Sequence, residues 1–210
     1  MFISRDIDDF LEKRMFFGKA LIVYGPRQAG KTTSIEHFLA RPEFASNVIR
    51  FDGEEPADCA LLADAPTEKL KLLTGGKKII FIDEAHKVPN IGLVLKRLWD
   101  HVKSVQTIAT GSSSEELAEK TEEPMTGRKF EYTLLPPSFS ELARADAPLN
   151  EVRALGRRLV YGSYPDVVTH PGDEMDRLRE LGKGYLYKDI LKYGEIKRPE
   201  LLDRIVSALA

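Results

Sequence analysis

The stretch YGPRQAGKTTS, residues 24–34, follows the apolar run KALIV and decides the fold. It matches the pattern G-x-x-x-x-G-K-S/T at Gly25, Gly30, Lys31 and Thr32. The glycines let backbone N–H groups surround phosphate oxygens, and the helix that follows presents the positive end of its dipole. The alternative is a chance match at an ordinary strand-to-helix turn, but the strand before and the helix after the motif argue against it. The stretch therefore predicts a phosphate-binding loop.

Two residues of this loop have defined expected roles. We expect Lys31 to reach the β- and γ-phosphates of a nucleotide and the Thr32 hydroxyl to ligate Mg²⁺. Arg27 and Gln28 lie inside the loop and either contact phosphate or only shape the backbone.

A second motif, KKIIFIDEAHK at residues 77–87, places two carboxylates after an apolar strand. We expect Asp83 to hold the Mg²⁺ through water. Glu84 is expected to polarise an attacking water as a general base, which is typically worth about 10²–10⁴ in rate. An acidic pair after a strand is otherwise often a helix N-cap. Together with the phosphate loop, the pair favours hydrolysis of ATP, and the chain has no N-K-x-D stretch for reading guanine.

Two further polar segments follow. TIATGSSS, residues 107–114, ends a strand with Thr110 and Ser112, which either sense the γ-phosphate and the attacking water or cap the next helix. TGRKFEY, residues 126–132, places Arg128 before the last strand. An arginine supplied to the γ-phosphate of a neighbouring subunit can add about 10³–10⁵ in rate, although most surface arginines have no such role.

Composition limits the class of protein. The chain has 210 residues and a formal net charge of -2, so the overall charge does not support nucleic-acid binding. Such binding is not excluded, because basic residues can still gather in local patches. The single cysteine, Cys59, suits a reducing compartment. No apolar run approaches the roughly 20 residues of a membrane span. The start MFISRDIDDF is too acidic for a signal peptide. We therefore expect a cytoplasmic protein with no membrane contact.

Strand and helix patterns alternate along the first two thirds of the chain. The expected strands are residues 19–24, 47–53, 77–83, 104–110 and 128–135. Their apolar runs are mostly continuous, which is typical of parallel strands covered on both faces. Between the third and fourth strands, residues 90–102 show the apolar spacing of a helix that covers a sheet. After LLPPSF the pattern is helical, so we predict an α/β core over residues 1–137 and a helical region over 138–210.

Five segments, in this order, resemble a family of bacterial and archaeal AAA-type ATPases that typically carry a C-terminal domain of unknown function: GPRQAGKTT, IIFIDEAHK, TGSSS, GRKFEYTLLPPSFSEL and GSYPDVV. The resemblance extends from Arg5 to Ile190. It implies a P-loop NTPase of the ASCE class with a five-stranded parallel sheet in the order 5-1-4-3-2. Residues 138–210 would then be a helical lid and the start of the C-terminal domain, most of which is expected to be missing from this chain.

The resemblance also implies roles for individual residues. Asp83 and Glu84 would be the Walker B pair, Thr110 and Ser112 the polar sensor, and Arg128 the arginine finger of a homo-oligomer. The N-terminal segment around Ile3–Ile7 is a candidate for the adenine pocket. The Walker A residues expected to bind the nucleotide are Gly25, Pro26, Arg27, Gln28, Ala29, Gly30, Lys31, Thr32 and Thr33.

The sequence thus predicts a Mg²⁺-dependent ATPase that hydrolyses ATP to ADP and phosphate. The alternative is a nucleotide-dependent switch that turns over slowly or not at all and regulates a partner or the C-terminal domain. Glu84 is the feature that favours hydrolysis, since a pure switch does not need it. A phosphotransferase is less well supported because nothing in the sequence marks an acceptor pocket.

Overall fold

The computed structural model describes residues 2–111, 117, 120–121 and 123–188. The chain divides into two compact units, residues 1–152 and 153–210. Among the described residues, no helix is long and apolar enough to cross a membrane.

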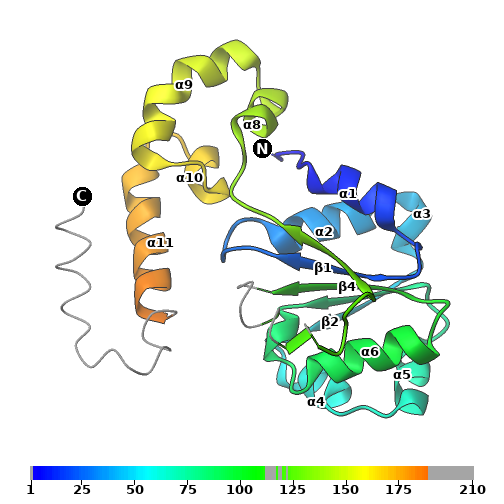
Figure 1. Cartoon of the computed structure of the whole chain (residues 1–210). Coiled ribbons are helices and arrows are strands. Elements are labelled where there is room, and N and C mark those ends of the chain that lie inside the picture. The colour runs from blue at the N-terminus through cyan, green and yellow to red at the C-terminus, as the bar shows by residue number, and fades with distance from the viewer. Residues whose placement is uncertain (1, 112–116, 118–119, 122, 189–210) are drawn as a thin grey trace. The chain divides into compact units, whose positions relative to one another are not determined.

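The first unit is built on a five-stranded parallel sheet (Figure 1). Its strands are β1 (Ala20–Tyr24), β2 (Val48–Asp52), β3 (Ile79–Asp83), β4 (Gln106–Gly111) and β5 (Lys129–Thr133). Their order is β2-β3-β4-β1-β5, and all four neighbouring pairs are parallel. Read from the other edge, this is the predicted order 5-1-4-3-2. The α/β fold class of a P-loop NTPase is therefore confirmed.

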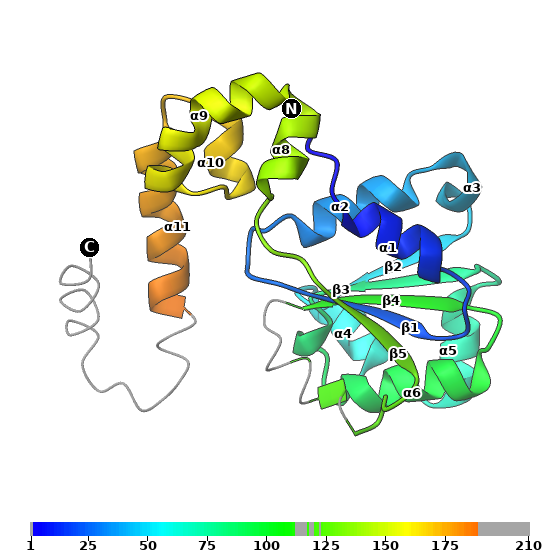
Figure 2. The ribbon, with the colours of Figure 1, turned by 45° about the horizontal axis from the view of Figure 1, so that its top comes forward.

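Helices cover both faces of the sheet (Figure 2). One face packs against α1 (Ile7–Arg14), α2 (Lys31–Leu39) and the short α3 (Pro42–Ala45). The other packs against α4 (Pro56–Leu62), α5 (Thr67–Thr74), the 3₁₀ turn η1 (Ala85–Lys87) and α6 (Ile91–His101). Because side chains alternate along a strand, Leu21 and Val23 of β1 join the first cluster while Ile22 and Tyr24 join the second. Each such buried apolar side chain contributes about 1.5–3 kcal/mol.

The predicted helix over residues 90–102 is confirmed as α6. Its apolar stripe faces the sheet, and the stripe residues are all buried: Ile91, Val94, Leu95, Leu98 and Val102. This spacing of buried residues explains why α6 forms a continuous layer over the strands.

The segment after β5 leads into helices. The Leu134 N–H donates to the carbonyl oxygen of Tyr24, 2.8 Å away, so the β1–β5 pairing continues one residue past the strand. Then α8 (Phe139–Ala145) begins with a capping box, in which Ser138 and Glu141 each bond the backbone N–H of the other. These bonds fix where α8 starts.

The described residues after 137 form only helices and loops. Beyond α8 these helices are α9 (Pro148–Tyr161), α10 (Pro165–Thr169) and α11 (Glu174–Lys188). Within the second unit, Arg177 of α11 lies 3.6 Å from Asp166 of α10 and 3.3 Å from Asp173. The helical character expected for this region is observed, whereas its division from the core at residue 137 stays a prediction.

Candidate functional site

The loop between β1 and α2 depends on two glycines. Gly25 has φ +153°, and a Cβ atom there would lie 2.1 Å from the carbonyl oxygen of Leu134. Gly30 precedes α2 in the left-handed region, with φ +92°. The loop therefore lies directly against the backbone that follows β5, and only glycine fits at its first position.

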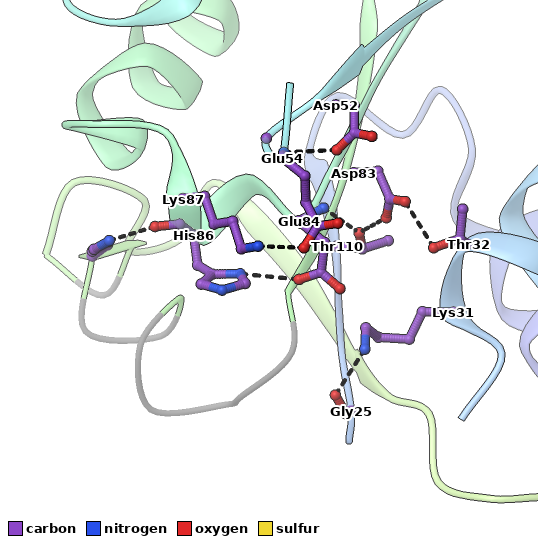
Figure 3. Close-up of polar contacts among 12 residues, drawn as sticks. Gly25, Lys31, Thr32, Asp52, Glu54, Asp83, Glu84, His86, Lys87 and Thr110 are labelled. Carbon is purple, nitrogen blue, oxygen red and sulfur yellow. Dashed lines mark hydrogen bonds and ion pairs between the residues drawn. The ribbon is translucent and has the colours of Figure 1, made fainter. Parts of the chain in front are cut away.

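Lys31 is the first residue of α2, and it is buried, with 4% of its surface exposed. Its Nζ donates to the carbonyl oxygen of Gly25, 3.0 Å away (Figure 3), and to that of Pro26, also 3.0 Å away. Burial lowers the pKa of Lys31, while the carboxylates of Glu84 and Asp83 act in the opposite direction. The ammonium group is thus enclosed by the loop, where phosphate oxygens can replace the two carbonyls as acceptors.

Asp83 joins three elements at the carboxyl edge of the sheet. The Thr32 hydroxyl of α2 donates to Asp83 Oδ2, 2.7 Å away. The Thr110 hydroxyl, which is fully buried at the end of β4, donates to Asp83 Oδ1 (Figure 3). The carboxylate at the tip of β3 therefore has one hydrogen-bond donor on each oxygen.

The Thr32 and Asp83 oxygens suit a magnesium ion. Ligands at 2.0–2.1 Å on an octahedron lie about 2.9 Å apart along each edge. The observed separation of 2.7 Å between Thr32 Oγ1 and Asp83 Oδ2 is close to that value. Both oxygens can therefore face one ion, either directly or through a bound water.

Glu84 leaves the strand in a different direction from Asp83. Its backbone has φ +42°, in the left-handed region, and its N–H donates to Thr110 Oγ1 at 3.0 Å. Its Oε2 lies 3.2 Å from Nδ1 of the buried His86. Burial raises the pKa of Glu84, the charge of Lys31 lowers it, and Asp83 raises it again. The contact with His86 was not predicted, because it depends on the left-handed turn at Glu84.

The remaining loop residues surround this centre. Gln28 has φ +58°, unusual for a residue other than glycine, which is consistent with a role in shaping the loop. Ala29 is fully buried, whereas Thr33 is exposed on α2. Ser112 lies outside the described residues, so of the two expected sensor residues only Thr110 can be placed beside Asp83.

Arg128 does not lie near the phosphate loop of its own chain. It precedes β5, and β5 is paired in parallel with β1, so Arg128 lies at the amino edge of the sheet. A five-residue strand separates the two edges by roughly 16 Å. The Nε of Arg128 is 3.7 Å from Asp100, and its guanidinium lies 4.9 Å from the centre of the Trp99 ring. A role for Arg128 in the site of a neighbouring subunit stays a prediction.

One contact with the loop comes from a residue outside every motif. The Arg5 guanidinium donates to the carbonyl oxygen of Ala29, 2.9 Å away. A single arginine before a short helix has no sequence pattern that could have indicated this contact.

The comparisons with known proteins agree with this geometry. A family model described as an AAA domain matches residues 18–143. The chain is similar to the solved Walker-type ATPase of Pyrococcus abyssi, with a TM-score of 0.62 and 14% identity, over 93% of this chain and 77% of that one. It is also similar to the Orc1 protein of Aeropyrum pernix, solved in complex with DNA, with a TM-score of 0.50 and 16% identity, over 73% of this chain and 50% of that one. No curated protein matches the chain significantly. At these identities the solved structures support the fold alone.

Proposed function

The chain belongs to the AAA domain family of P-loop ATPases, and we propose that it binds ATP with Mg²⁺ and hydrolyses it to ADP and phosphate. One observation carries the proposal. The side chains of Lys31, Thr32 and Asp83, which lie up to 52 positions apart in the sequence, meet at one edge of the sheet. That is the edge at which parallel α/β sheets bind their ligands.

The loop would hold the phosphates. Backbone N–H groups between Gly25 and Lys31, together with the start of α2, would surround the phosphate oxygens. The Lys31 ammonium would exchange its two loop carbonyls for oxygens of the β- and γ-phosphates.

Thr32 and Asp83 would hold the metal. The Mg²⁺ ion, when bound, neutralises charge that develops on the phosphate oxygens. The second Asp83 oxygen would remain bonded to Thr110, which keeps the carboxylate from rotating. Thr110 would therefore position the metal ligand from the neighbouring strand β4.

Glu84 would act on the attacking water. Its backbone is fixed by Thr110, and its carboxylate points away from that of Asp83 toward His86 (Figure 3). A carboxylate beside the phosphates but outside the metal shell is suited to accept a proton from water. In this arrangement Asp83 and Glu84, although adjacent, have separate tasks.

The second candidate is a nucleotide-dependent switch with negligible turnover. It is favoured by the contact between Glu84 and His86, 3.2 Å apart, because an oxygen held by the imidazole is less available to a water molecule. In that case nucleotide binding would persist without hydrolysis.

We extend the proposal to the organisation of the protein. Residues 1–137 would form the ATPase core, and residues 138–210 a helical lid followed by the start of a further domain. Arg128 would complete the site of a neighbouring copy in a homo-oligomer. A cytoplasmic location is consistent with the single cysteine. The net charge of -2 supports no nucleic-acid partner for this chain.

Phosphate release from ATP and Mg²⁺ tests these proposals when measured over a range of protein concentrations. We expect turnover that rises steeply with concentration and is lost in Lys31→Ala and Glu84→Gln. Glu54→Gln is the matched control, since it neutralises a more exposed carboxylate near the site, one that pairs with Lys87 and has no proposed part in catalysis. Tight ADP binding without any turnover would favour the switch, and the absence of nucleotide binding would refute both functions.

A further inference from the structure

Arg5 connects three distant segments of the first unit. Its side chain is buried, with 6% of the residue exposed. Nε donates to Glu141 Oε1 at 3.0 Å, one Nη to the carbonyl oxygen of Ala29 at 2.9 Å, and the other Nη to that of Leu135 at 2.5 Å. These acceptors lie 136, 24 and 130 positions away in the sequence. All three guanidinium nitrogens are thus used, each by a different part of the fold.

This arrangement requires arginine. The guanidinium presents its donors in a rigid planar fork, whereas a lysine ammonium is a single point that cannot reach three separated acceptors. A buried cation is also costly unless a carboxylate compensates it. Glu141 provides that charge, and the side chains of the pair are both 5% exposed.

Glu141 is itself held in place. Its Oε1 accepts the N–H of Asp6 at 2.8 Å, and its Oε2 accepts the N–H of Ser138 at 2.7 Å. Its own N–H bonds the Ser138 hydroxyl at 3.2 Å in the capping box of α8. The carboxylate therefore has one fixed orientation, from which it determines the position of Arg5.

The contact with Ala29 sets the direction of one peptide group. In a trans peptide the C=O of one residue and the N–H of the next point in opposite directions. Because the Ala29 carbonyl points to Arg5, the N–H of Gly30 points in the opposite direction, away from Arg5. Gly30 directly precedes Lys31, at the position where the phosphate motif needs an inward N–H.

The far end of the loop is held against the same segment. Gly25 packs on the carbonyl of Leu134, and Arg5 bonds the carbonyl of the next residue, Leu135. The backbone after β5 therefore supports the loop at both ends, directly at Gly25 and through Arg5 at Ala29.

We propose that Arg5, fixed by Glu141, is a positioning residue that holds the Gly30 N–H in the direction needed to bind phosphate. The inference rests on the proposed function, since its consequence is nucleotide affinity. Arg5 touches no reacting atom in this arrangement, so it acts only through the loop.

The test compares Arg5→Lys and Arg5→Met with the wild-type chain in two measurements. The first is the dissociation constant for ADP with Mg²⁺, which we expect to rise about tenfold in both variants, the effect of losing roughly one well-placed hydrogen bond. The second is backbone hydrogen exchange over residues 25–33 without nucleotide, which we expect to become faster. Lysine should not rescue the loop, although it keeps the charge.

Leu70→Ala is the matched control. Leu70 is fully buried in the cluster of α4–α6, on the face of the sheet opposite α2. We expect it to lower the Tm as much as Arg5→Lys while leaving ADP affinity and loop exchange unchanged. Glu141→Gln keeps the size of the side chain and should shift both readouts in the same direction as the Arg5 variants.

The outcomes separate this inference from the proposed function. If the wild-type chain binds ADP and the Arg5 variants bind it equally well, the positioning role is overturned. Equal losses of affinity in Arg5→Lys and Leu70→Ala at matched Tm would also overturn it, since the effect would then be general destabilisation. If the wild-type chain binds no ADP, the proposed function fails. Hydrogen exchange then tests the positioning role by itself, and exchange over residues 25–33 that is equal in the Arg5 variants and the wild type would refute that role as well. Should Arg5→Met fail to fold, Arg5→Lys and Glu141→Gln provide both readouts.

Discussion

Replacing Thr110 by valine should remove the hydrogen bonds between the end of β4 and the end of β3 while leaving the packing of the two strands unchanged. The Thr110 side chain is fully buried, and its hydroxyl both donates to Asp83 and accepts the Glu84 N–H at 3.0 Å. Valine has nearly the same volume but can do neither. Asp83 would lose a donor, and the backbone N–H of Glu84 would lose its acceptor.

The size of the effect follows from these two bonds. A hydrogen bond to a charged group contributes about 1.5–3 kcal/mol, and an orphaned buried N–H costs about 1–3 kcal/mol. Asp83 is half-buried, so a water molecule can replace part of the hydrogen bonding that its carboxylate loses. We therefore expect the free energy of unfolding to fall by about 2–4 kcal/mol, measured by urea denaturation without nucleotide or metal. Phosphate release should also fall, because Glu84 loses the bond that fixes its backbone.

Thr107→Val provides the control for this experiment. Thr107 lies on the same strand and is buried, with 5% exposed, but it takes no part in the Asp83 network. We expect it to change the free energy of unfolding by less than half as much as Thr110→Val. A Thr110→Val protein as stable as the wild type, or a Thr107→Val protein equally destabilised, would refute this account of the site.

Three further results are expected. Gly25→Ala should abolish nucleotide binding in a thermal-shift assay with ADP and Mg²⁺, because the new Cβ would lie 2.1 Å from the Leu134 carbonyl oxygen; retained binding would show that the loop can move away. Burial alone would raise the pKa of Glu141, but its bonds to the N–H groups of Ser138 and Asp6 and to the Arg5 guanidinium hold it below the ordinary value of a glutamate. Since the folded pKa lies below the unfolded one, this carboxylate stabilises the fold above about pH 4.3, and the contribution is lost as the pH falls through the folded pKa. Unfolding in urea between pH 7 and pH 3 should therefore show a steeper loss for the wild type than for Glu141→Gln, and equal slopes would contradict this. Finally, a mixture of Lys31→Ala and Arg128→Ala should recover phosphate release that neither has alone, because each supplies what the other lacks; an inactive mixture would argue against a shared site.

The fold could be predicted because its signals are local and repeated. The strands are mostly continuous apolar runs, clearest in β1 and β3, and the Gly25–Thr32 motif is typical of the turn from a strand to a helix in this class of sheet. Lys31, Thr32 and Asp83 followed from the same motifs, since in a parallel sheet the carboxyl ends of the strands share one edge. The structure places these three residues together as the motifs require.

The supporting contacts could not be predicted, because they depend on details of the backbone. The bond between Arg5 and Glu141 joins residues 136 positions apart, and it exists only because the capping box starts α8 at Ser138. The contact between Glu84 and His86 depends on a left-handed turn that glutamate rarely adopts. Neither leaves a pattern in residue type or spacing.

The single tryptophan gives the chain an optical reporter of its own. Trp99 donates its indole N–H to the Gly18 carbonyl at 2.6 Å and lies under the Arg128 guanidinium, at the edge of the sheet opposite the phosphate loop. A cation on the ring face changes the surroundings of the indole, so its fluorescence should respond when Arg128 leaves it. Nucleotide bound in the same subunit lies too far away to act directly. A change in emission that appears only at high protein concentration would then report the approach of a second subunit, with no label attached to the protein.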